Sequence, residues 1–338
     1  MKRALVTGGG GFVGSHIVRQ LLEEGVECLV VGRNRYPEIE ALGARCLKGD
    51  IGDVDFLRKS FAAVDTVFHV AALAGIWGPW KQYHQVNVVG TQNVIDACRY
   101  AEVPRLVYTS TPSVVFNGAD IVNGDESLPY ARKFLCNYAR SKVIAEKNVL
   151  ESSGEPDGFL SCAIRPHLVW GPGDPHLIPR LLERGRSRDL RKIGNCTNLV
   201  DISYVENVAE AHLLAARNLE TCRSAAGKAY FISQGKAVNL WNWIDELFQQ
   251  TGVPEIQSRV PFPVAYMAGY MLEAVHHVFA AEKEPKMTRF LAEQLARSHC
   301  FSIANAEKDL GYVPRVSTEE GMRRLQESLL IQQESQKQ

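Results

Sequence analysis

The stretch Leu5-Val6-Thr7-Gly8-Gly9-Gly10-Gly11-Phe12-Val13-Gly14 decides the fold. Its apolar start suits a buried strand, and Gly8, Gly11 and Gly14 have the spacing of a dinucleotide-binding fingerprint. In that motif the glycines permit a tight turn, a close approach of the backbone to a pyrophosphate, and dense packing of helix on strand. The N–H groups at the start of the next helix would face the phosphates. The residues expected to contact a dinucleotide here are Gly8, Gly11, Phe12 and Val13.

The residues after the fingerprint predict an amphipathic helix. Apolar side chains recur on one helical face, and Gly25 follows at the expected end of the helix. Glycine-rich turns also occur for purely steric reasons, so a structural turn is the alternative. The strand before the glycines and the helix after them favour a nucleotide site. The residues of the apolar face are Phe12, Val13, Ile17, Val18, Leu21 and Leu22.

The composition is that of a globular protein with a large core. The chain has 338 residues, and 46% of them are hydrophobic. Basic and acidic residues number 38 each, so no overall field favours nucleic acid or an anionic membrane, and any charged ligand must be held locally. The eight cysteines form no Cys-x-x-Cys pair, and no signal-peptide pattern precedes the first strand. We therefore expect a cytoplasmic location.

Apolar runs alternate with helical patterns along the first half of the chain. Further strands are expected over 26–31, 45–48, 64–70 and 103–108, and another closes at Arg165-Pro166. This order predicts an α/β fold, a doubly wound parallel Rossmann sheet with a smaller, mostly helical C-terminal lobe that binds substrate. The expected division is a nucleotide-binding domain over 1–170, to which 198–236 returns, and a substrate lobe made of 171–197 and 237–338.

The end of the second strand bears on the choice of cofactor. In an NAD site, a carboxylate about twenty residues past the fingerprint binds the ribose 2′-hydroxyl. That place holds Gly32 and Arg33 here, and the next acid is Glu38. The guanidinium groups of Arg33 and Arg35 would bind a 2′-phosphate through charge-assisted contacts. We therefore predict NADP over NAD; a solvated basic loop is the alternative.

Residues after the third and fourth strands are expected to line the same site. Asp50 and Ile51 are placed to receive the adenine, although Asp50 would serve equally as the cap of the helix that follows. Ala71 and Ala72 are small enough to let a cofactor pass over the sheet edge.

The loop after the fourth strand carries Trp77 and Trp80, at the edge where open parallel sheets bind ligands. This favours a wall of the substrate site, with packing onto the helix below as the alternative.

A hydroxyl cluster and a tyrosine–lysine pair form the predicted catalytic constellation. The fifth strand ends in Thr109-Ser110-Thr111-Pro112-Ser113, and Tyr138 and Lys142 share one face of a later helix. A nearby ammonium lowers a tyrosine pKa that would otherwise be about 10. The phenol can then exchange a proton with a substrate oxygen while hydride moves to or from a nicotinamide. Each feature alone is weak evidence, but their order after the glycine fingerprint is specific.

In this order of motifs, nearly the whole chain resembles the extended short-chain dehydrogenase/reductase superfamily. Thr7-Gly8-Gly9-Gly10-Gly11-Phe12-Val13-Gly14 is similar to the family's Thr-Gly-x-x-Gly-Phe-x-Gly, and Tyr138 and Lys142 match its catalytic pair. The resemblance implies a homodimer, because extended members often pair through a four-helix interface.

The resemblance also assigns roles by position. Thr111 matches the family's catalytic hydroxyl, with Ser110 and Ser113 as alternatives. Pro166 falls in the segment whose backbone meets the nicotinamide amide. Tyr138 and Lys142 would contact the cofactor as well as the substrate.

Within the superfamily, the chain is most similar to the 3β-hydroxysteroid dehydrogenase branch. Segments 69–80 and 86–91 resemble the 2-alkyl-3-oxoalkanoate reductases of bacterial long-chain olefin synthesis, and segment 109–129 resembles sterol-4α-carboxylate 3-dehydrogenases. This implies NADPH-dependent reduction of the 3-oxo group of a large hydrophobic keto acid. The alternatives are NAD-dependent oxidation of a 3β-hydroxysteroid or sterol carboxylate, and a non-catalytic nucleotide-sensing protein. Candidate cations for the substrate carboxylate, which the sequence does not rank, are Lys81, His84, His167, His176 and Arg180.

The later stretch 261–281 is apolar but holds Glu273, His276 and His277, which makes a membrane-spanning helix a poor fit. An amphipathic helix is expected, which would cover an apolar substrate, rest on a membrane surface, or pack in the core. The adjacent histidines point about 100° apart on a helix, so no metal site is expected. His69, at the end of a strand, is expected to be a satisfied core residue.

Overall fold

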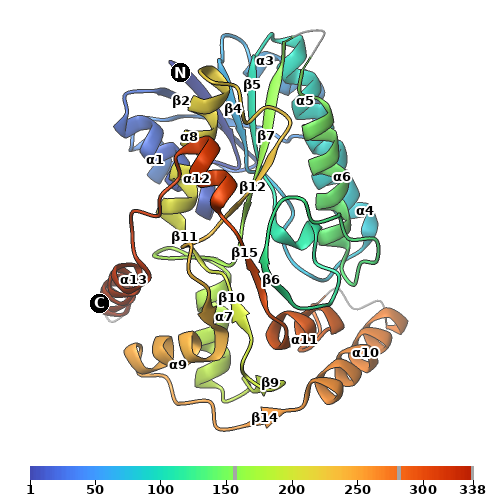
Figure 1. Cartoon of the computed structure of the whole chain (residues 1–338). Helices are drawn as coiled ribbons and strands as arrows, with labels where there is room; N and C mark the ends of the chain where they lie inside the picture. Colours follow the sequence, from blue (N-terminus) through green and yellow to red (C-terminus); the bar gives the residue numbers. More distant parts are fainter. Residues whose placement is uncertain (155–157, 280–282, 336–338) are drawn as a thin grey trace.

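The computed structural model describes residues 1–154, 158–279 and 283–335 (Figure 1). A seven-stranded parallel sheet forms the centre of its larger part, which confirms the predicted doubly wound α/β fold. The order across the sheet is β12-β7-β5-β4-β1-β2-β3, so the chain reverses direction of winding between β1 and β4. The strands are β1 (Arg3–Thr7), β2 (Glu27–Gly32), β3 (Arg45–Lys48), β4 (Thr66–His69), β5 (Arg105–Thr109), β7 (Leu160–Pro166) and β12 (Ala229–Ile232).

Helices cover both faces of this sheet because both faces of its strands are apolar. The core on one face includes side chains of α1 and α8, and the core on the other includes side chains of α3, α5 and α6. The helices of the first face are α1 (Phe12–Glu23), α8 (Val205–Glu220) and α12 (Ala304–Leu310), and those of the second are α3 (Val54–Ser60), α5 (Gly90–Tyr100) and α6 (Asn137–Glu151). A short helix, α2 (Pro37–Glu40), links β2 to β3.

Helix α1 can start close to β1 only because position 14 is glycine. A Cβ atom on Gly14 would lie 2.2 Å from the carbonyl oxygen of Gly8 and 2.8 Å from the Cα of Gly9. Real Cβ atoms do not approach other atoms so closely. The third glycine of the fingerprint therefore has the packing role that its spacing predicts.

The smaller part contains short strands that the sequence does not predict. A four-stranded sheet has the order β13-β10-β15-β6, and two further strand pairs lie beside it. Strands of two residues leave no period-two pattern, which is why only a mostly helical lobe was expected. The strands are β6 (Ile121–Gly124), β8 (Val169–Trp170), β9 (Lys192–Ile193), β10 (Leu199–Val200), β11 (Ser203–Tyr204), β13 (Val238–Asn239), β14 (Arg259–Val260) and β15 (His299–Phe301).

A second hydrophobic core holds this part together. Trp170, Trp241 and Trp243 are almost fully buried in it, against the apolar faces of α7 and α9. The helices of this part are α7 (Leu177–Arg186), α9 (Leu240–Gln250), α10 (Phe262–Val278), α11 (Arg289–Ala296) and α13 (Thr318–Ser335).

The helical segment after β4 begins at Trp80 and contains a wider turn. Helix α4 (Trp80–Tyr83) runs into a π-helical segment, His84–Val89, and then into α5. The side-chain amide of Asn87, in the π-helical segment, accepts from the backbone N–H of Leu73 and donates to its carbonyl. The same amide also donates to the hydroxyl of Ser141. This residue thus ties the loop after β4 to α6.

Four histidines lie buried in the two cores, and burial lowers the pKa of each. The imidazole of His69 lies 2.7 Å from the hydroxyl of Thr7 and 2.9 Å from that of Thr91, which confirms a satisfied core residue. Its pKa is lowered to about 3, and that of His212 to about 4. The rings of His167 and His299 are joined by a 2.6 Å hydrogen bond between the two parts of the molecule. The four are His69, His167, His212 and His299.

The predicted amphipathic helix over 261–281 is α10, but its apolar residues face outward. Met267 is 56% exposed and Met271 is 59% exposed, so the expectation that this face packs in the core is wrong. Positions 280 and 281 lie outside the described residues. No helix in the described part of the chain is both long and apolar enough to cross a membrane.

Candidate active site

One cavity of about 550 Å³ lies where the carboxyl ends of the central strands meet the start of α7. Most residues that the sequence analysis proposed for cofactor binding or catalysis line it, but Arg35 and Ser113 do not. The proposed residues that line it include Gly8, Gly11, Phe12, Val13, Arg33, Asp50, Ile51, Ala71, Ala72, Thr111, Tyr138, Lys142 and Pro166. Side chains from both ends of the first 170 residues are thus brought to one edge of the sheet, as the strand order requires.

The glycine loop makes a wall of bare backbone on this cavity. Gly8 has a φ of +70°, and a Cβ there would lie 2.9 Å from the backbone of Ala71. Its N–H donates to the carbonyl of Val31 at 2.8 Å, and its carbonyl accepts from the N–H of Gly11 at 2.9 Å. A wall without side chains at the start of a helix suits the pyrophosphate of a dinucleotide, so the residues present fit that cofactor.

At the β2 end of the cavity, Arg33 is exposed and Tyr36 covers the glycine loop. A Cβ on Gly10 would lie 2.1 Å from the ring of Tyr36, and one on Gly32 would lie 2.7 Å from its hydroxyl. The sequence analysis missed Tyr36. The one feature of the sequence that could have indicated it is an aromatic residue four positions after β2 ends.

Asp50 lines the cavity and does not cap the following helix. Its carboxylate accepts from the N–H of Gly52 at 2.7 Å. The cap of α3 is Asp53, whose carboxylate accepts from the N–H of Phe56 at 3.0 Å. The capping alternative for Asp50 is therefore wrong. Helix α3 begins at Val54, and an N-cap is the residue just before the helix, which binds an N–H two or three positions further on.

The phenol of Tyr138 and the hydroxyl of Thr111 meet in the cavity. Tyr138 lies in the first turn of α6, and Thr111 opens the short 3₁₀ turn Pro112–Val114 after β5. Burial raises the pKa of Tyr138, and a hydrogen bond with Thr111 lowers it in part. Thr111 also donates to the hydroxyl of Ser113 at 3.1 Å. The phenol is therefore protonated at neutral pH and shares a small hydroxyl network.

Lys142 is buried one turn after Tyr138, but it does not lower the tyrosine pKa as the sequence analysis expected. Its ammonium donates to the carbonyl of Thr109 at 2.6 Å and lies 4.1 Å from the ring centroid of Tyr108. Burial lowers the pKa of Lys142 itself to about 7, against the opposing effect of Glu146. The amino group of Lys142 is thus only partly charged at neutral pH and points to a carbonyl, so it does not offset the rise in the Tyr138 pKa that burial causes.

A buried ion pair fixes α6 to the sheet below this site. Arg165, in β7, donates to the carboxylate of Glu146 through two nitrogens, at 2.6 and 3.0 Å. The hydroxyl of Tyr130 donates to the same carboxylate at 2.7 Å. Glu146 is fully buried one helical turn after Lys142, so the pair sets the position of the helix that carries Tyr138 and Lys142.

The two tryptophans after β4 do not line the cavity in the described structure. Trp77 packs against His277 of α10, and Trp80 lies under the guanidinium of Arg140. The hydroxyl of Tyr83 donates to the carbonyls of Gly75 and Trp77 at 2.8 and 3.1 Å, and its ring lies 6.5 Å from that of Tyr138. Tyr83, rather than a tryptophan, connects this loop to the site.

The structure ranks the candidate cations for a substrate carboxylate. His176 alone among the five lines the cavity. His167 is buried against His299, and Arg180 is paired with Glu284 at 2.5 Å. His176 stands beside Asp174, whose carboxylate caps the start of α7 by accepting from the N–H groups of residues 176, 177 and 178.

Comparison of sequences matches this chain to known oxidoreductases. The model of the 3-beta hydroxysteroid dehydrogenase/isomerase family matches residues 5–264. A 2-alkyl-3-oxoalkanoate reductase of Stenotrophomonas maltophilia is 44% identical over 328 residues, which cover 96% of this chain and 99% of that protein. A decarboxylating sterol-4-alpha-carboxylate 3-dehydrogenase of Mus musculus is 34% identical over 97% of this chain and 91% of its own length. Such relatives remove the support for a non-catalytic protein.

Comparison of structures gives the same fold with a bound cofactor. MoeE5, solved in complex with UDP-glucose and NAD, superposes with a TM-score of 0.75 at 26% identity, over 98% of this chain and 99% of its own. That neighbour holds a nicotinamide cofactor, as the glycine wall of this cavity would.

The burial of Lys142 predicts a characteristic pH dependence of stability. Its pKa is 10.5 in ordinary surroundings and about 7 in the folded protein. Between these values the unfolded chain binds the proton that the folded chain releases, so this residue adds stability as the pH rises from about 7 to 10.5. We expect Lys142→Met to be more stable than the wild type at neutral pH by a few kcal/mol, with a difference that shrinks across this window.

Urea unfolding of both proteins without cofactor, at a series of pH values, measures this difference. Lys147→Met on the exposed side of α6 is the matched control and should show no such trend. A difference between wild type and Lys142→Met that is independent of pH would show that Lys142 is not buried as described.

Proposed function

Because the chain belongs to the 3-beta hydroxysteroid dehydrogenase/isomerase family, we propose that it reduces the 3-oxo group of a large hydrophobic 3-keto acid with NADPH. It is a nicotinamide-dependent oxidoreductase. The substrate class is carried by one observation: 44% identity to a 2-alkyl-3-oxoalkanoate reductase along almost the entire length of both chains. The protonated phenol in the cavity supports the direction of the reaction, because reduction needs a proton donor.

In the proposed mechanism Tyr138 is the acid. The ketone oxygen would accept hydrogen bonds from the hydroxyls of Tyr138 and Thr111, which polarises the carbonyl. When bound, the cofactor supplies the hydride that adds to the carbonyl carbon. As the carbonyl electrons move to oxygen, Tyr138 donates its proton to that oxygen, which yields a secondary alcohol and a phenolate. Solvent then returns a proton to the phenolate. Lys142, which lines the same cavity, would contact the cofactor.

The charges at the β2 end of the cavity support NADP. Arg33 is the guanidinium that lines this end. Asp50 follows β3, which pairs with β2 here, but its carboxylate already accepts from the N–H of Gly52 at 2.7 Å, and Asp174 lies at the start of α7. A 2′-phosphate would pair with Arg33.

His176 is the proposed partner of the substrate carboxylate. It is exposed and lines the cavity together with its neighbour Leu177. Its N–H groups would bind a carboxylate one carbon away from the ketone. The backbone under it is rigid because Asp174 caps the helix at that point.

A sterol substrate is the second candidate. It is favoured by the 34% identity to a sterol-4-alpha-carboxylate 3-dehydrogenase. Both candidate substrates carry an oxygen function one carbon removed from a carboxylate. They differ in the direction of reaction and in cofactor, so the comparison of NADPH with NAD separates them.

Tyr138→Phe should lower kcat/KM for keto-acid reduction by about 10³-fold, because it removes the acid that contributes 10²–10⁴-fold in such sites. The dissociation constant of NADPH should change little. Steady-state kinetics and fluorescence titration of NADPH measure the two. Thr111→Val should cost less, and Tyr270→Phe on the outer side of α10 is the control. Turnover near that of the wild type in Tyr138→Phe with cofactor bound would reject the assignment.

Arg33→Asp should raise the KM for NADPH about a hundredfold while the KM for NADH changes less, because a charged pair with the 2′-phosphate becomes a repulsion. The ratio of kcat/KM values for the two cofactors is the measurement. Arg35→Asp, whose side chain does not line the cavity, is the matched control. A wild-type preference for NADH would contradict the choice of cofactor.

His176→Gln should raise the KM for the keto acid about tenfold with kcat nearly unchanged, as expected when binding is lost equally in ground and transition states. The same variant should reduce a ketone of equal chain length without a carboxylate as well as the wild type does. Lys81→Gln is the control for a general loss of positive charge. An equal effect on both substrates would show that His176 does not bind the carboxylate.

A further inference from the structure

Helix α10 presents a continuous apolar face to solvent. Its exposed residues recur every three or four positions, which places them on one side of the helix. They belong to a shallow open groove of about 700 Å³ that also includes Pro263, Ala268 and Leu272. The apolar stripe, as we name it, consists of Val264, Met267, Met271, Val275 and Val278, which are 57%, 56%, 59%, 50% and 79% exposed. Isolated exposed side chains are ordinary, but a stripe along one helix is not.

The opposite side of α10 is firmly attached. Glu273 is 4% exposed, and its carboxylate accepts from the backbone N–H and the guanidinium of Arg289, both at 2.7 Å. A Cβ on Gly269 would lie 2.6 Å from the backbone of Thr288, so α10 and α11 are in close backbone contact there. The stripe is therefore the outer side of a docked helix.

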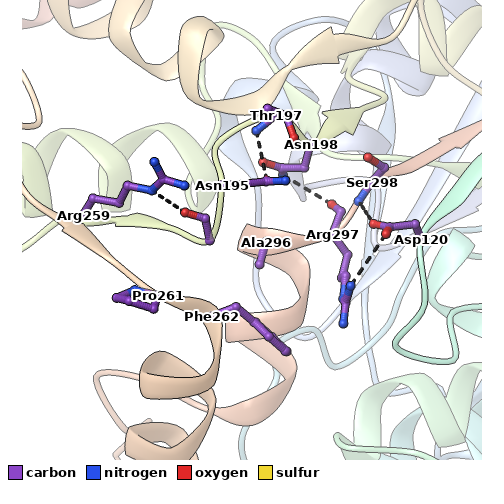
Figure 2. Close-up of a pocket in the computed structure, with 11 residues that line it drawn as sticks. Asp120, Asn195, Thr197, Asn198, Arg259, Pro261, Phe262, Ala296, Arg297 and Ser298 are labelled. Atoms are coloured by element: carbon purple, nitrogen blue, oxygen red, sulfur yellow. Dashed lines mark hydrogen bonds and ion pairs between the residues drawn. The ribbon is translucent and has the colours of Figure 1, made fainter.

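A polar pocket adjoins the first turn of α10 (Figure 2). Arg259 donates to the carbonyl of Gly194 at 2.5 Å. Arg297 lies 3.6 Å from the carboxylate of Asp120, with its Cζ 4.9 Å from the ring centroid of Phe262. The arginine pocket, as we name it, is lined by Asp120, Gly194, Asn195, Thr197, Asn198, Arg259, Pro261, Phe262, Ala296, Arg297 and Ser298.

The residues that line the arginine pocket carry an excess of positive charge. Two guanidiniums face one carboxylate, Asp120, so its net formal charge is positive. The Nε of Arg297 and the Oδ1 of Asn198 are buried and have no hydrogen-bond partner among the described residues. Asn198 is 3% exposed. Both atoms are buried, so a ligand would bind the outer nitrogens of the guanidinium groups; the side chain of Arg297 is 38% exposed.

Together the two features match an amphiphile with a negative headgroup. The stripe begins at Val264, two residues after Phe262 in the wall of the arginine pocket. A second copy of the chain fits less well. Along α10 the one carboxylate is that of Glu273, which is buried and already paired with Arg289, and Glu284 beyond it is paired with Arg180. The side of α10 that carries the stripe thus offers the arginines of another copy no free acidic partner.

We propose that the apolar stripe and the arginine pocket dock this protein on the surface of an anionic phospholipid bilayer. The stripe would enter the boundary between headgroups and acyl chains, and Arg259 and Arg297 would bind phosphate groups.

Three successive contacts connect α10 to the proposed acid. His277 packs against Trp77 at 4.8 Å between ring centroids, and Tyr83 binds the carbonyl of Trp77 while its ring contacts Tyr138. A hydrophobic keto acid dissolved in the bilayer would so meet the enzyme on the side that carries its site. This benefit rests on the proposed function, whereas the docking itself does not.

The test is co-sedimentation of the full chain with phosphatidylcholine vesicles, with and without phosphatidylglycerol. We expect the wild type to sediment with the anionic vesicles. Met267→Glu combined with Met271→Glu should reduce partitioning at least about tenfold, because it places charge on the inserted face. Arg259→Gln and Arg297→Gln should each reduce it about fivefold on anionic vesicles and have no effect on neutral ones.

Val313→Glu, which charges an exposed apolar residue between α12 and α13, and Arg19→Gln on α1 are the matched controls and should bind as the wild type does. Circular dichroism and NADPH binding check that each variant is folded. Equal sedimentation of the wild type with neutral and anionic vesicles would overturn the proposal, as would unchanged binding by the stripe variant. So would a wild-type oligomer, measured by sedimentation equilibrium, that dissociates in the stripe variant while vesicles capture neither protein.

Discussion

Two buried cations beneath α6 are the constraint on which the site depends. Arg165 reaches up from β7 to a carboxylate on the helix, and Lys142 reaches down from the helix to the carbonyl of Thr109 in β5. A buried charge that loses its partner costs several kcal/mol, so any slide or rotation of α6 that broke these contacts would be opposed by that cost. Because Tyr138 lies in the same helix one turn before Lys142, these contacts also fix its position. Packing alone would tolerate small shifts of the helix, but paired charges in a core do not.

The same burial that positions these groups also sets their charge states. Lys142 is buried and Tyr138 is partly buried, so the phenol keeps its proton and the ammonium loses part of its charge. The site is therefore close to neutral until a charged cofactor enters it. The bound cofactor would therefore set the charge of the site. The glycine wall and the hydroxyl network are already in place without it. Around it, Asn87 and Tyr83 hold the loop after β4 through backbone carbonyls, so the loop depends on hydrogen bonds rather than on a core of its own.

The sequence predicted the parts that depend on local spacing. The glycine loop and the shared helical face of Tyr138 and Lys142 follow from residues a few positions apart, and the structure gathers them around one cavity. What it missed depends on distant contacts. The ring of Tyr36 over Gly10 follows from how the chain turns after β2, and the short strands of the second sheet follow from distant partners, such as His299 of β15 opposite Ile121 of β6. Periodicity identified the face shared by Met267 and Met271 but could not tell whether that face points inward. The raised pKa of Tyr138 comes from burial, which no neighbouring residue in the sequence reveals.

The buried histidines give the fold an asymmetric response to proton concentration. In the folded chain His69 and His212 protonate only near pH 3 to 4, whereas an unfolded imidazole protonates at 6.5. Below pH 6.5 the unfolded chain takes up protons that the folded chain refuses, so the free energy of unfolding falls continuously towards the folded pKa values. The hydrogen bond that joins His167 to His299 spans both parts of the molecule and is lost when both rings are charged. Acidification would thus lower the free energy of unfolding through residues of the core, and an acidic compartment would inactivate this enzyme by unfolding it.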